Sequence, residues 1–361
     1  MTSDGLSGTV SAVVINFNGG AKLRDSVLSL CSQTVALQSI VVVDNGSTDT
    51  SVDSIDNIDP RVTTLELGEN LGLTRARNAG MRAVESDFIL LCDNDICLAP
   101  SALDHLLNTA ETEHAAVVCP RIVYHPDRDT IQTDGAKSHY LGLMSMRRPD
   151  TPVLGSISEV TAVNSAIGAC YLLKRQQIID CGGFNELYFF YFEDLEFALR
   201  IRARGLQMIF DSNAVVFHNR GAGTPGLSFR GAGSYPRLRA ELSMRNRLLT
   251  IALHFQTRTL FVMSPALVVY ECTNFAYCLL RGWTSDWFRS WHWITRHRNE
   301  IIKRRRKLNE VRKIGDRQLL SGGPIPFSKG FLSGSVQRFL ANALSGVLNA
   351  YWLLARHLLR D

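Results

Sequence analysis

Short apolar runs alternate with amphipathic stretches along the first 120 residues. Runs rich in aliphatic and β-branched residues occupy 9–15, 39–43, 62–67 and 88–92, and they have the length of buried strands. Between the first two runs, residues 21–33 place apolar side chains three, four and seven positions apart, which predicts a helix. A second helix is predicted over 74–84. This alternation predicts an α/β fold with a doubly wound, mostly parallel sheet.

The pattern changes twice further along the chain. Residues 115–121 continue the sheet, and the polar, irregular excursion 122–154 predicts a hairpin or a lid over a site. A second strand-like run at 160–173 is followed by a helix at 193–204 and a strand at 208–217. Beyond residue 240 the pattern is helical, without strand signals. We therefore predict two domains, residues 1–245 and residues 246–361.

Charge is distributed unevenly between these parts. Residues 241–361 hold 19 of the 39 Lys and Arg residues but 7 of the 34 Asp and Glu residues, a net charge of +12, whereas residues 1–240 carry −7. Basic segments of this kind bind nucleic acid or anionic lipid. Because the basic residues are interleaved with aromatic and long apolar stretches, the pattern favours an anionic membrane surface and argues against nucleic acid.

The eight cysteines lack paired CxxC spacing, and several lie in apolar runs, as is typical of reduced thiols in a cytoplasmic protein. The first eight residues have no basic flank before a short apolar run, so we expect no cleaved targeting segment. The composition therefore favours a cytoplasmic location, peripheral on the cytoplasmic face of the membrane.

Two carboxylates follow the strand predicted at 88–92. Asp93-Asn94-Asp95 leaves the sheet edge directly, and two carboxylates at this spacing suit a divalent cation that also binds phosphate oxygens. The alternative is a solvated acidic turn. His218 ends another predicted strand, and although a single histidine is more often a packing or surface residue, it can complete a carboxylate and imidazole site with Asp93-Asn94-Asp95.

A run of five aromatic residues, 188–192, precedes Glu193 and Asp194 at the start of a predicted helix. Carboxylates at a helix N-terminus can serve simply as capping groups. The aromatic run instead favours a partly desolvated environment, in which a carboxylate can act as a general base.

Several segments resemble successive signatures of glycosyltransferase family 2. They occur in the family's order over residues 9–250, and they are VVINFNGG, VVVDNGSTD, NLGLTRARNAG, LLCDNDI, GACYLLKR, GGFNELYFFYFEDLEFALRIRARG and VFHNRG. The chain is most similar to the bacterial and archaeal rhamnosyltransferase-like branch. The resemblance implies a GT-A fold for residues 1–245, with the basic helical region as a C-terminal extension.

The resemblance also implies a role for each matching residue. It implies nucleotide-sugar binding by Phe17, Asp44, Arg77 and Asp93, with Phe17 and Asp44 at the base and ribose. It implies that Asp95 and His218, with Asp93 beside them, hold Mg²⁺ or Mn²⁺ at the diphosphate, that Asp194 is the catalytic base, and that Glu193, Gly168 and Ala169 shape the acceptor side. Two positions depart from the branch, which commonly has Asn-Pro-Asp where this chain has Asp93-Asn94-Asp95 and Asp where it has Glu196.

The expected activity is metal-dependent, inverting transfer of a sugar from a UDP- or dTDP-linked donor, rhamnose among the candidates, to a glycan or lipid-linked acceptor in cell-surface polysaccharide or glycoconjugate synthesis. A nucleotidyltransferase shares the sheet and the acidic site but usually carries a basic glycine-rich loop after the first strand, where this chain offers only Lys22. An inactive GT-A scaffold of a membrane glycan-assembly complex is the other alternative.

The C-terminal region contains two long apolar stretches. Residues 260–280 have the length of a membrane span but include Pro265, Glu271 and Asn274, which favours a helix in the membrane interface or against the catalytic domain over a true span. Residues 331–359 form a second amphipathic stretch that could equally make a homo-oligomer contact. Four tryptophans between 283 and 293 precede the basic run 296–307, a pairing typical of the bilayer headgroup region, although a solvated basic helix is the alternative.

Overall fold

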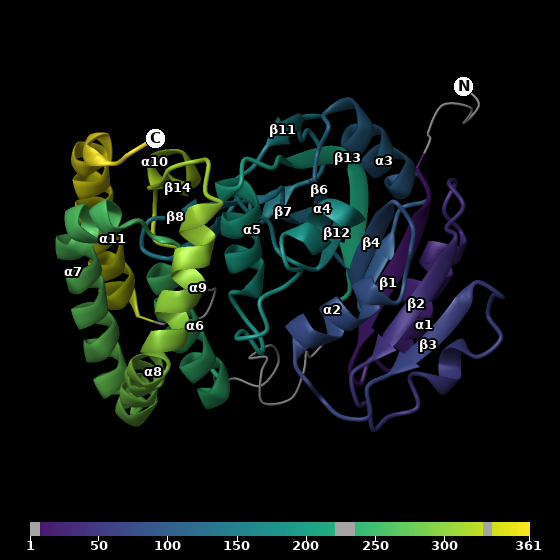
Figure 1. Ribbon diagram of the computed structural model, residues 1–361, viewed down its shortest axis with the longest axis horizontal. Coiled ribbons are helices and arrows are strands. Elements are labelled where there is room, and N and C mark those ends of the chain that lie inside the picture. The colour runs from purple at the N-terminus through teal and green to yellow at the C-terminus, as the bar shows by residue number, and fades with distance from the viewer. Residues whose placement is uncertain (1–7, 221–234, 328–333) are drawn as a thin grey trace. The chain divides into compact units, whose positions relative to one another are not determined.

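The computed structural model describes residues 8–220, 235–327 and 334–361 (Figure 1). These residues divide into two compact units. The sheet unit comprises residues 8–136, 146–197 and 206–220, and the helical unit comprises 137–145, 198–205, 235–327 and 334–361. Each unit is described by itself below.

A parallel array forms the first half of the sheet unit. The four strands β1 (Val10–Asn16), β2 (Ser39–Asp44), β3 (Val62–Glu66) and β4 (Phe88–Asp93) lie in the order β3-β2-β1-β4. On the other side of β4, β12 (Cys170–Lys174) runs antiparallel to both β4 and β6 (Val117–Tyr124). The predicted α/β class with a mostly parallel sheet is confirmed.

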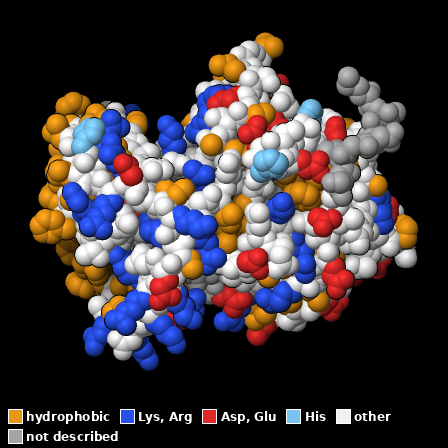
Figure 2. Space-filling model, turned by 45° about the horizontal axis from the view of Figure 1, so that its top comes forward, with side chains coloured by type: hydrophobic (Ala, Val, Ile, Leu, Met, Phe, Trp, Pro, Cys, Tyr) orange, Lys and Arg blue, Asp and Glu red, His pale blue; other side chains and the backbone are white. Residues whose placement is uncertain are grey.

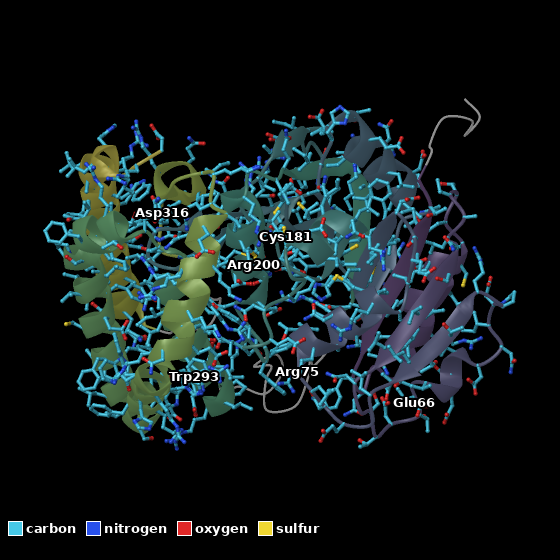
Figure 3. The ribbon with its side chains drawn as sticks, viewed as in Figure 1. Glu66, Arg75, Cys181, Arg200, Trp293 and Asp316 are labelled. Carbon is cyan, nitrogen blue, oxygen red and sulfur yellow. The ribbon has the colours of Figure 1, made fainter. Side chains whose placement is uncertain are left out.

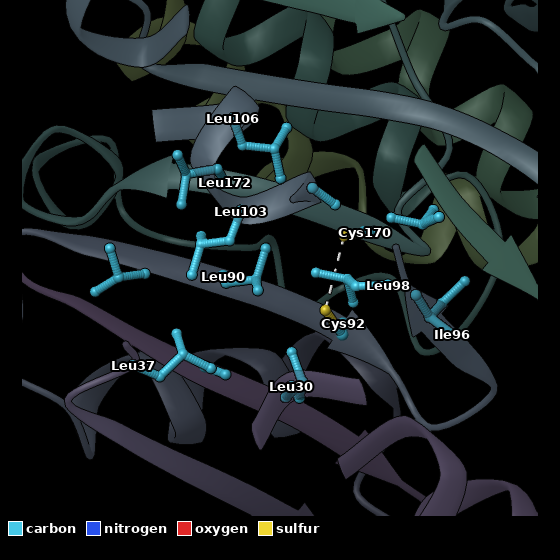
Figure 4. Packing of buried hydrophobic residues seen from close by; sticks show 14 of the residues in the cluster. Leu30, Leu37, Leu90, Cys92, Ile96, Leu98, Leu103, Leu106, Cys170 and Leu172 are labelled. Carbon is cyan, nitrogen blue, oxygen red and sulfur yellow. Dashed lines mark hydrogen bonds between the residues drawn. The ribbon is translucent and has the colours of Figure 1, made fainter. Parts of the chain in front are cut away.

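Helices cover both faces of this sheet. Leucines of α1 (Ala21–Cys31) and α3 (Ala102–Thr112) share one buried cluster with β1, β2 and β4 (Figure 4). Helix α2 (Leu73–Arg82) packs against β1 and β2, and Phe197 of α5 (Glu193–Ala203) stacks on Tyr171 of β12. Alternate strand residues point to opposite faces, so nearly continuous apolar runs such as VSAVVIN are needed to supply both layers.

The second half of the sheet corrects one prediction. Residues 160–173 do not form one strand, because β11 (Val160–Ala162) pairs with β13 (Met208–His218), whereas β12 lies between β4 and β6. Strand β13 also runs parallel to β6 and antiparallel to the short β5 (Ile96–Leu98). These pairings bring the end of β13 to the residues that follow β4.

The excursion after residue 122 extends the sheet as strands. Strand β6 continues to Tyr124, and β7 (Thr130–Thr133) and β10 (Thr151–Pro152) add to its edge, so a hairpin is formed. The buried Asp134 carboxylate anchors this segment, since Arg121 binds both of its oxygens at 2.9 Å and Arg148 binds one at 3.0 Å. The sheet unit also contains η1 (Asp53–Ile55) and α4 (Arg175–Asp180).

Six helices make up most of the helical unit, together with a short final turn. They are α6 (Arg237–His254), α7 (Thr257–Arg281), α8 (Thr284–Arg296), α9 (Arg298–Glu310), α10 (Asp316–Leu319), α11 (Ser335–Ala355) and η2 (Arg356–Leu358). Asp316 (Figure 3) accepts a 2.6 Å hydrogen bond from the Gln256 amide and pairs with Arg312 at 2.7 Å, which fixes the junction between α6 and α7.

This region contains one strand that the sequence did not predict, and it bears on two other predictions, the domain boundary and the second amphipathic stretch. A small sheet of β8 (Ala136–His139), β9 (Leu143–Met146) and β14 (Leu320–Ser321) adds a strand beyond residue 240 that the sequence pattern did not indicate. Residue 245 lies inside α6, and the division into two domains stays a prediction. Residues 331–333 of the predicted amphipathic stretch lie outside the described residues.

Candidate functional site

The carboxyl ends of three parallel strands place polar side chains along one edge of the sheet. Asn16 ends β1, Asp44 ends β2 and Asp93 ends β4, and the strand register sets Asn16 opposite Asp44 and Ile15 opposite Asp93. Because β12 runs antiparallel, the residues that precede it reach the same edge. Open α/β sheets bind their ligands at such an edge.

The β1–β2 side of this edge is a hydrogen-bonded amide and carboxylate network. Asn16 donates to Asp44 at 2.9 Å and accepts from Asn94 at 2.8 Å. The Ser47 hydroxyl and amide both donate to the Asp44 carboxylate, at 2.6 and 3.0 Å. Phe17 follows Asn16 and is half-buried. The predicted contacts of Phe17 and Asp44 with a nucleotide stay predictions, and the two residues lie at the carboxyl ends of β1 and β2.

Arg77 of α2 is buried at the centre of the site. Its guanidinium donates to Asp93 at 3.1 Å, to the Gly168 carbonyl at 2.6 Å and to Glu193 at 3.4 Å, and it lies over the Phe184 ring. With 1% of its side chain exposed, Arg77 links three chain segments. Its predicted role in donor binding stays a prediction.

Gly168 and Ala169 precede β12 and connect the two sides of the site. Gly168 accepts the short hydrogen bond from Arg77, and its own amide donates to the Asp194 carboxylate. A Cβ atom on Gly168 would lie 2.7 Å from Arg77 Nη1, so only glycine allows this close approach. The Ala169 carbonyl accepts from the Asp93 amide at 2.9 Å, which ties the end of β4 to the same loop.

The aromatic run is fixed by contacts with the start of α2. The Phe189 carbonyl accepts from the Leu73 amide at 2.9 Å, and the Tyr188 carbonyl accepts from the Thr74 hydroxyl at 2.6 Å. Gly72, with φ +88°, lies so close that a Cβ atom would be 2.6 Å from the Phe189 ring. Tyr191 and Phe192 then adopt left-handed backbone angles, φ 67° and 66°, immediately before α5 begins. Strained backbone of this kind is found where a site requires a fixed geometry.

Glu193 and Asp194 form a desolvated carboxylate pair at the start of α5. Burial, followed by repulsion from Asp194, raises the pKa of Glu193 to about 8, although Arg77 opposes the shift. Burial also raises the pKa of Asp194, while amide hydrogen bonds from Leu195 and Gly168 favour its charged form. The buried pair therefore resists a second negative charge, and the amide hydrogen bonds favour Asp194 as its charged member. Within the described residues, Glu193 Oε2 is buried without a hydrogen-bond partner.

Asp95 and His218 meet because β5 and β13 pair next to them. The register sets His218 opposite Ile96, and His218 Nε2 lies 3.2 Å from Asp95 Oδ1. Burial opposes ionisation of Asp95, but the charge and hydrogen bond of the nearby His218 imidazole, together with Lys22 and a backbone amide, outweigh it and lower the pKa of Asp95. Gln132 Oε1 lies 2.9 Å from His218 Nδ1 and can only accept, so Nδ1 carries a proton and Nε2 faces Asp95.

The three predicted metal ligands do not form a single cluster. Asp95 and His218 are adjacent, whereas the Asp93 carboxylate pairs with Arg77, and burial raises the pKa of Asp93. Over residues 8–220, 235–327 and 334–361, no group of three or more His, Cys, Asp or Glu side chains is arranged to hold a metal. One carboxylate and one oriented imidazole still fit a divalent cation that takes its other ligands from phosphate oxygens and water.

Several residues of the site were not identified from the sequence. Gln132 orients His218 from β7, and only the β6–β7 pairing reveals it, because its local sequence resembles any polar hairpin. Asn16 and Asn94 carried a weak signal, since Asn16 directly follows an apolar strand run and Asn94 is the second residue after another. The positioning role of Arg77 had no sequence signal, because its partners are 16, 91 and 116 residues away.

Comparison with known families gives one domain match. Residues 11–167 match the model of glycosyl transferase family 2. An N-acetylglucosaminyl-diphospho-decaprenol L-rhamnosyltransferase of Mycobacterium tuberculosis is 25% identical over 242 residues, covering 61% of this chain and 78% of that protein. A low-salt glycan biosynthesis hexosyltransferase of Haloferax volcanii is 23% identical over 286 residues, covering 76% of this chain and 82% of that protein.

Solved structures support the fold. GalNAc-T7 with UDP, GalNAc and Mn²⁺ matches with a TM-score of 0.57 at 17% identity, covering 73% of this chain and 52% of that chain. Staphylococcus aureus TarS 1–349 in complex with UDP-GlcNAc matches with a TM-score of 0.52 at 17% identity, covering 78% and 79% of the two chains. This chain thus spans about half of the GalNAc-T7 structure. At 17% identity, both matches show similarity of fold alone.

Replacing Gly72 by alanine should weaken the support of the aromatic run. The new Cβ would clash with the Phe189 ring, and the positive φ of residue 72 would be strained for alanine. We therefore expect Gly72→Ala to lower the free energy of unfolding by about 2–4 kcal/mol in urea titrations. Gly68 also has a positive φ but nothing within 4 Å, so Gly68→Ala should cost only about 1–2 kcal/mol, from backbone strain. Equal losses for the two variants would contradict the packing role of Gly72.

The raised pKa of Glu193 makes a prediction about stability and pH. The unfolded chain releases this proton near pH 4.5, the folded chain near pH 8, so the Glu193 contribution to folding stability falls as pH rises through this window. Glu193→Gln should therefore gain stability relative to wild type as pH increases from 5 to 8, measured by urea unfolding at several pH values. Glu113→Gln, at an exposed position, is the matched control. A free energy of unfolding of Glu193→Gln that stays constant or falls relative to wild type as pH rises would refute the assignment.

Proposed function

We propose a reaction for this chain, which belongs to glycosyltransferase family 2 through residues 11–167 and has the GT-A fold. The reaction is inverting transfer of a sugar from a nucleoside diphosphate sugar to a hydroxyl of a glycan or lipid-linked acceptor. The proposed donor is a UDP- or dTDP-linked sugar, and rhamnose is among the candidate sugars. The observation that carries the proposal is the desolvated Glu193–Asp194 pair, joined through Arg77 to the end of β4.

The donor side of the reaction uses the strand ends. Asp44, held by Asn16 and Ser47, retains acceptor capacity on Oδ2 for a base or ribose donor group, and Phe17 directly follows Asn16 in the chain. Asp93 is partly exposed and keeps Oδ2 available for sugar or ribose hydroxyls, because Arg77 binds Oδ1. Asp95 and His218 would hold Mg²⁺ or Mn²⁺. Such an ion supplies positive charge to the departing nucleoside diphosphate.

The acceptor side uses the carboxylate pair. Asp194 accepts the proton of the attacking hydroxyl, and its raised pKa brings its basicity closer to that needed near neutral pH. Glu193, protonated near neutral pH, can donate from its unpartnered Oε2 to an acceptor oxygen and so orient it. A single base suffices, because one displacement at the sugar carbon inverts its configuration and the diphosphate leaves on the opposite side.

The relatives support a glycan-assembly role. The mycobacterial relative is named for transfer of L-rhamnose to a lipid-linked sugar, and the haloarchaeal relative for hexosyl transfer in glycan biosynthesis. We take from them the class of acceptor, a lipid-linked sugar or a growing glycan. An inactive scaffold with this fold remains the alternative outcome of the tests below.

Asp194→Asn should abolish transfer without weakening donor binding. The substitution keeps the shape of the side chain and removes its basicity, so we expect the turnover number to fall by about 10³-fold. The dissociation constant of the nucleotide, measured by calorimetric titration, should stay within about threefold of the wild-type value, because Asp194 acts on the acceptor.

Asp104→Asn is the matched control, since Asp104 also lies in the first turn of a helix of the sheet unit. Strong residual transfer by Asp194→Asn would place the base at Glu193 or elsewhere. Absence of transfer by the wild-type chain with every donor tested would favour the scaffold.

The nucleotide and the metal can be identified by thermal stability. UDP, dTDP, GDP and CDP are each added with Mn²⁺, Mg²⁺ or EDTA, and a ligand at 100 times its dissociation constant stabilises the folded state by about 2.7 kcal/mol. We expect one nucleotide to raise the melting temperature in a metal-dependent way. Asp95→Asn and His218→Gln should remove the metal-dependent part.

The exposed Asp127→Asn is the control for loss of negative charge outside the proposed site. A metal-dependent shift that survives in both Asp95→Asn and His218→Gln would show that the cation binds elsewhere. No shift with any nucleotide would again favour the scaffold.

A further inference from the structure

Helix α7 exposes an uncharged face along most of its length. Its largest exposed side chains are Phe261, Val268, Val269, Leu279 and Leu280, and Phe261 and Leu280 are each 81% exposed. Phe261 and Val268 are seven residues apart, and Val268 and Leu279 are eleven apart, so they lie on one side of the helix. The residues between them on this face are small or uncharged. Among the described residues, α7 is the one helix long and apolar enough, by length and composition, to cross a membrane. Only 17% of the 18-residue apolar segment of this helix is buried.

Helix α11 continues the same kind of face beside α7. The hydroxyl of Tyr351 donates to the Val262 carbonyl at 2.6 Å, which joins the two helices (Figure 1). On α11, Phe339, Leu340, Val347 and Leu354 are exposed, and Leu354 is 79% exposed. We call the exposed faces of α7 and α11 together the apolar face. Figure 2 shows hydrophobic side chains gathered on the surface of the helical unit.

The one acidic residue of α7 points away from this face. Glu271 pairs with Arg247 of α6 at 2.7 Å and accepts from the indole nitrogen of Trp287 of α8 at 2.7 Å. Phe275 packs on Trp287 and Phe288 in the same layer. The charge that counted against membrane contact in the sequence is therefore neutralised inside the helical unit.

Arginines mark both ends of both helices of the apolar face. Arg258 and Arg281 flank the stripe of α7, and Arg338 and Arg356 flank the stripe of α11, all four at exposed positions. The aromatic side chains of Phe288 and Trp291 are exposed on the adjoining α8. Arginine and tryptophan around an apolar surface are the composition of the bilayer headgroup region.

We infer that the apolar face binds an anionic lipid bilayer, with α7 and α11 lying in the plane of the interface. The inner side of α7 packs on polar and charged groups of α6 and α8, so the helix cannot cross the bilayer without taking those groups along. In the in-plane arrangement the apolar side chains enter the acyl region, while the arginines reach the lipid phosphates. This extends the proposed function, since a lipid-linked acceptor is presented at the same surface.

A second copy of the chain fits the apolar face less well. Residues 241–361 carry a net charge of +12, and the arginines at the rim would face like charges in a symmetric dimer. An anionic bilayer offers the opposite charge over the same area. Charge complementarity therefore selects lipid as the occupant.

The test uses the purified full chain and its exposed cysteine. Cys272 is the exposed one of the eight cysteines, and it lies in the middle of the α7 stripe. A nitrobenzoxadiazole label on Cys272 should shift its emission to the blue with phosphatidylcholine vesicles that contain phosphatidylglycerol, and should become protected from an aqueous quencher. Flotation of the unlabelled chain with the same vesicles measures partitioning directly.

Leu280→Glu/Leu354→Glu should weaken this partitioning by about tenfold or more, because two charged groups replace apolar side chains in the acyl region. Both positions are exposed, so the melting temperature should match wild type and show that the variant is folded. Leu154→Glu is the matched control, since Leu154 is a 95% exposed leucine of the sheet unit, and it should float as wild type does.

Two results would overturn the inference. One is wild-type flotation by Leu280→Glu/Leu354→Glu together with a Cys272 label that stays open to the aqueous quencher. The other combines two observations: the wild type does not bind vesicles, and it sediments as a dimer whereas Leu280→Glu/Leu354→Glu sediments as a monomer. A second copy of the chain would then cover the apolar face. Vesicle binding is measured without donor or acceptor, so its failure leaves the proposed transfer reaction untouched.

Discussion

The buried guanidinium of Arg77 is the contact on which the rest of the site depends. It holds the end of β4 through Asp93, the loop before β12 through Gly168, and the start of α5 through Glu193. A guanidinium suits this position because its planar fork can donate to several acceptors at once and it stays cationic when buried. Removing it would leave acidic groups desolvated without a counter-charge, a change that is strongly destabilising in protein interiors.

This one cation divides the carboxylates of the site into two classes. Arg77 cannot fully compensate three neighbouring acids, so burial still raises the pKa of Asp93, Glu193 and Asp194. Asp95 lies beside His218 instead, and its pKa is lowered. Acids whose environments push their pKa values apart can take different tasks. A carboxylate with a lowered pKa, such as Asp95, suits cation binding, and a buried pair with raised pKa values suits proton transfer.

The sequence predicted the parts of the site that depend on local pattern. Strand ends are visible as polar residues after apolar runs, so Asp93 and His218 were placed at strand ends, where the structure has them. Contacts across the chain were not visible. The sequence suggested one run over 160–173, whereas β11 and β12 join different strands, and nothing local distinguishes their pairing partners. Arg77 is a similar case, because burial and three distant partners decide its role and a helix pattern reveals neither.

Glu271 shows why the direction of a side chain must be known before its charge is weighed. Counted along the sequence, one glutamate in the middle of 260–280 argues against contact with lipid, since an unpaired charge in the acyl region is costly. In the folded chain its carboxylate binds Arg247 and the Trp287 indole on the inner side of α7. Its desolvation is then compensated inside the protein, and the outer side of the helix remains uncharged from Phe261 to Leu280. In the interfacial arrangement that we infer, Glu271 would stabilise α7, because it anchors the inner side of the helix to the protein and leaves the outer side available to lipid.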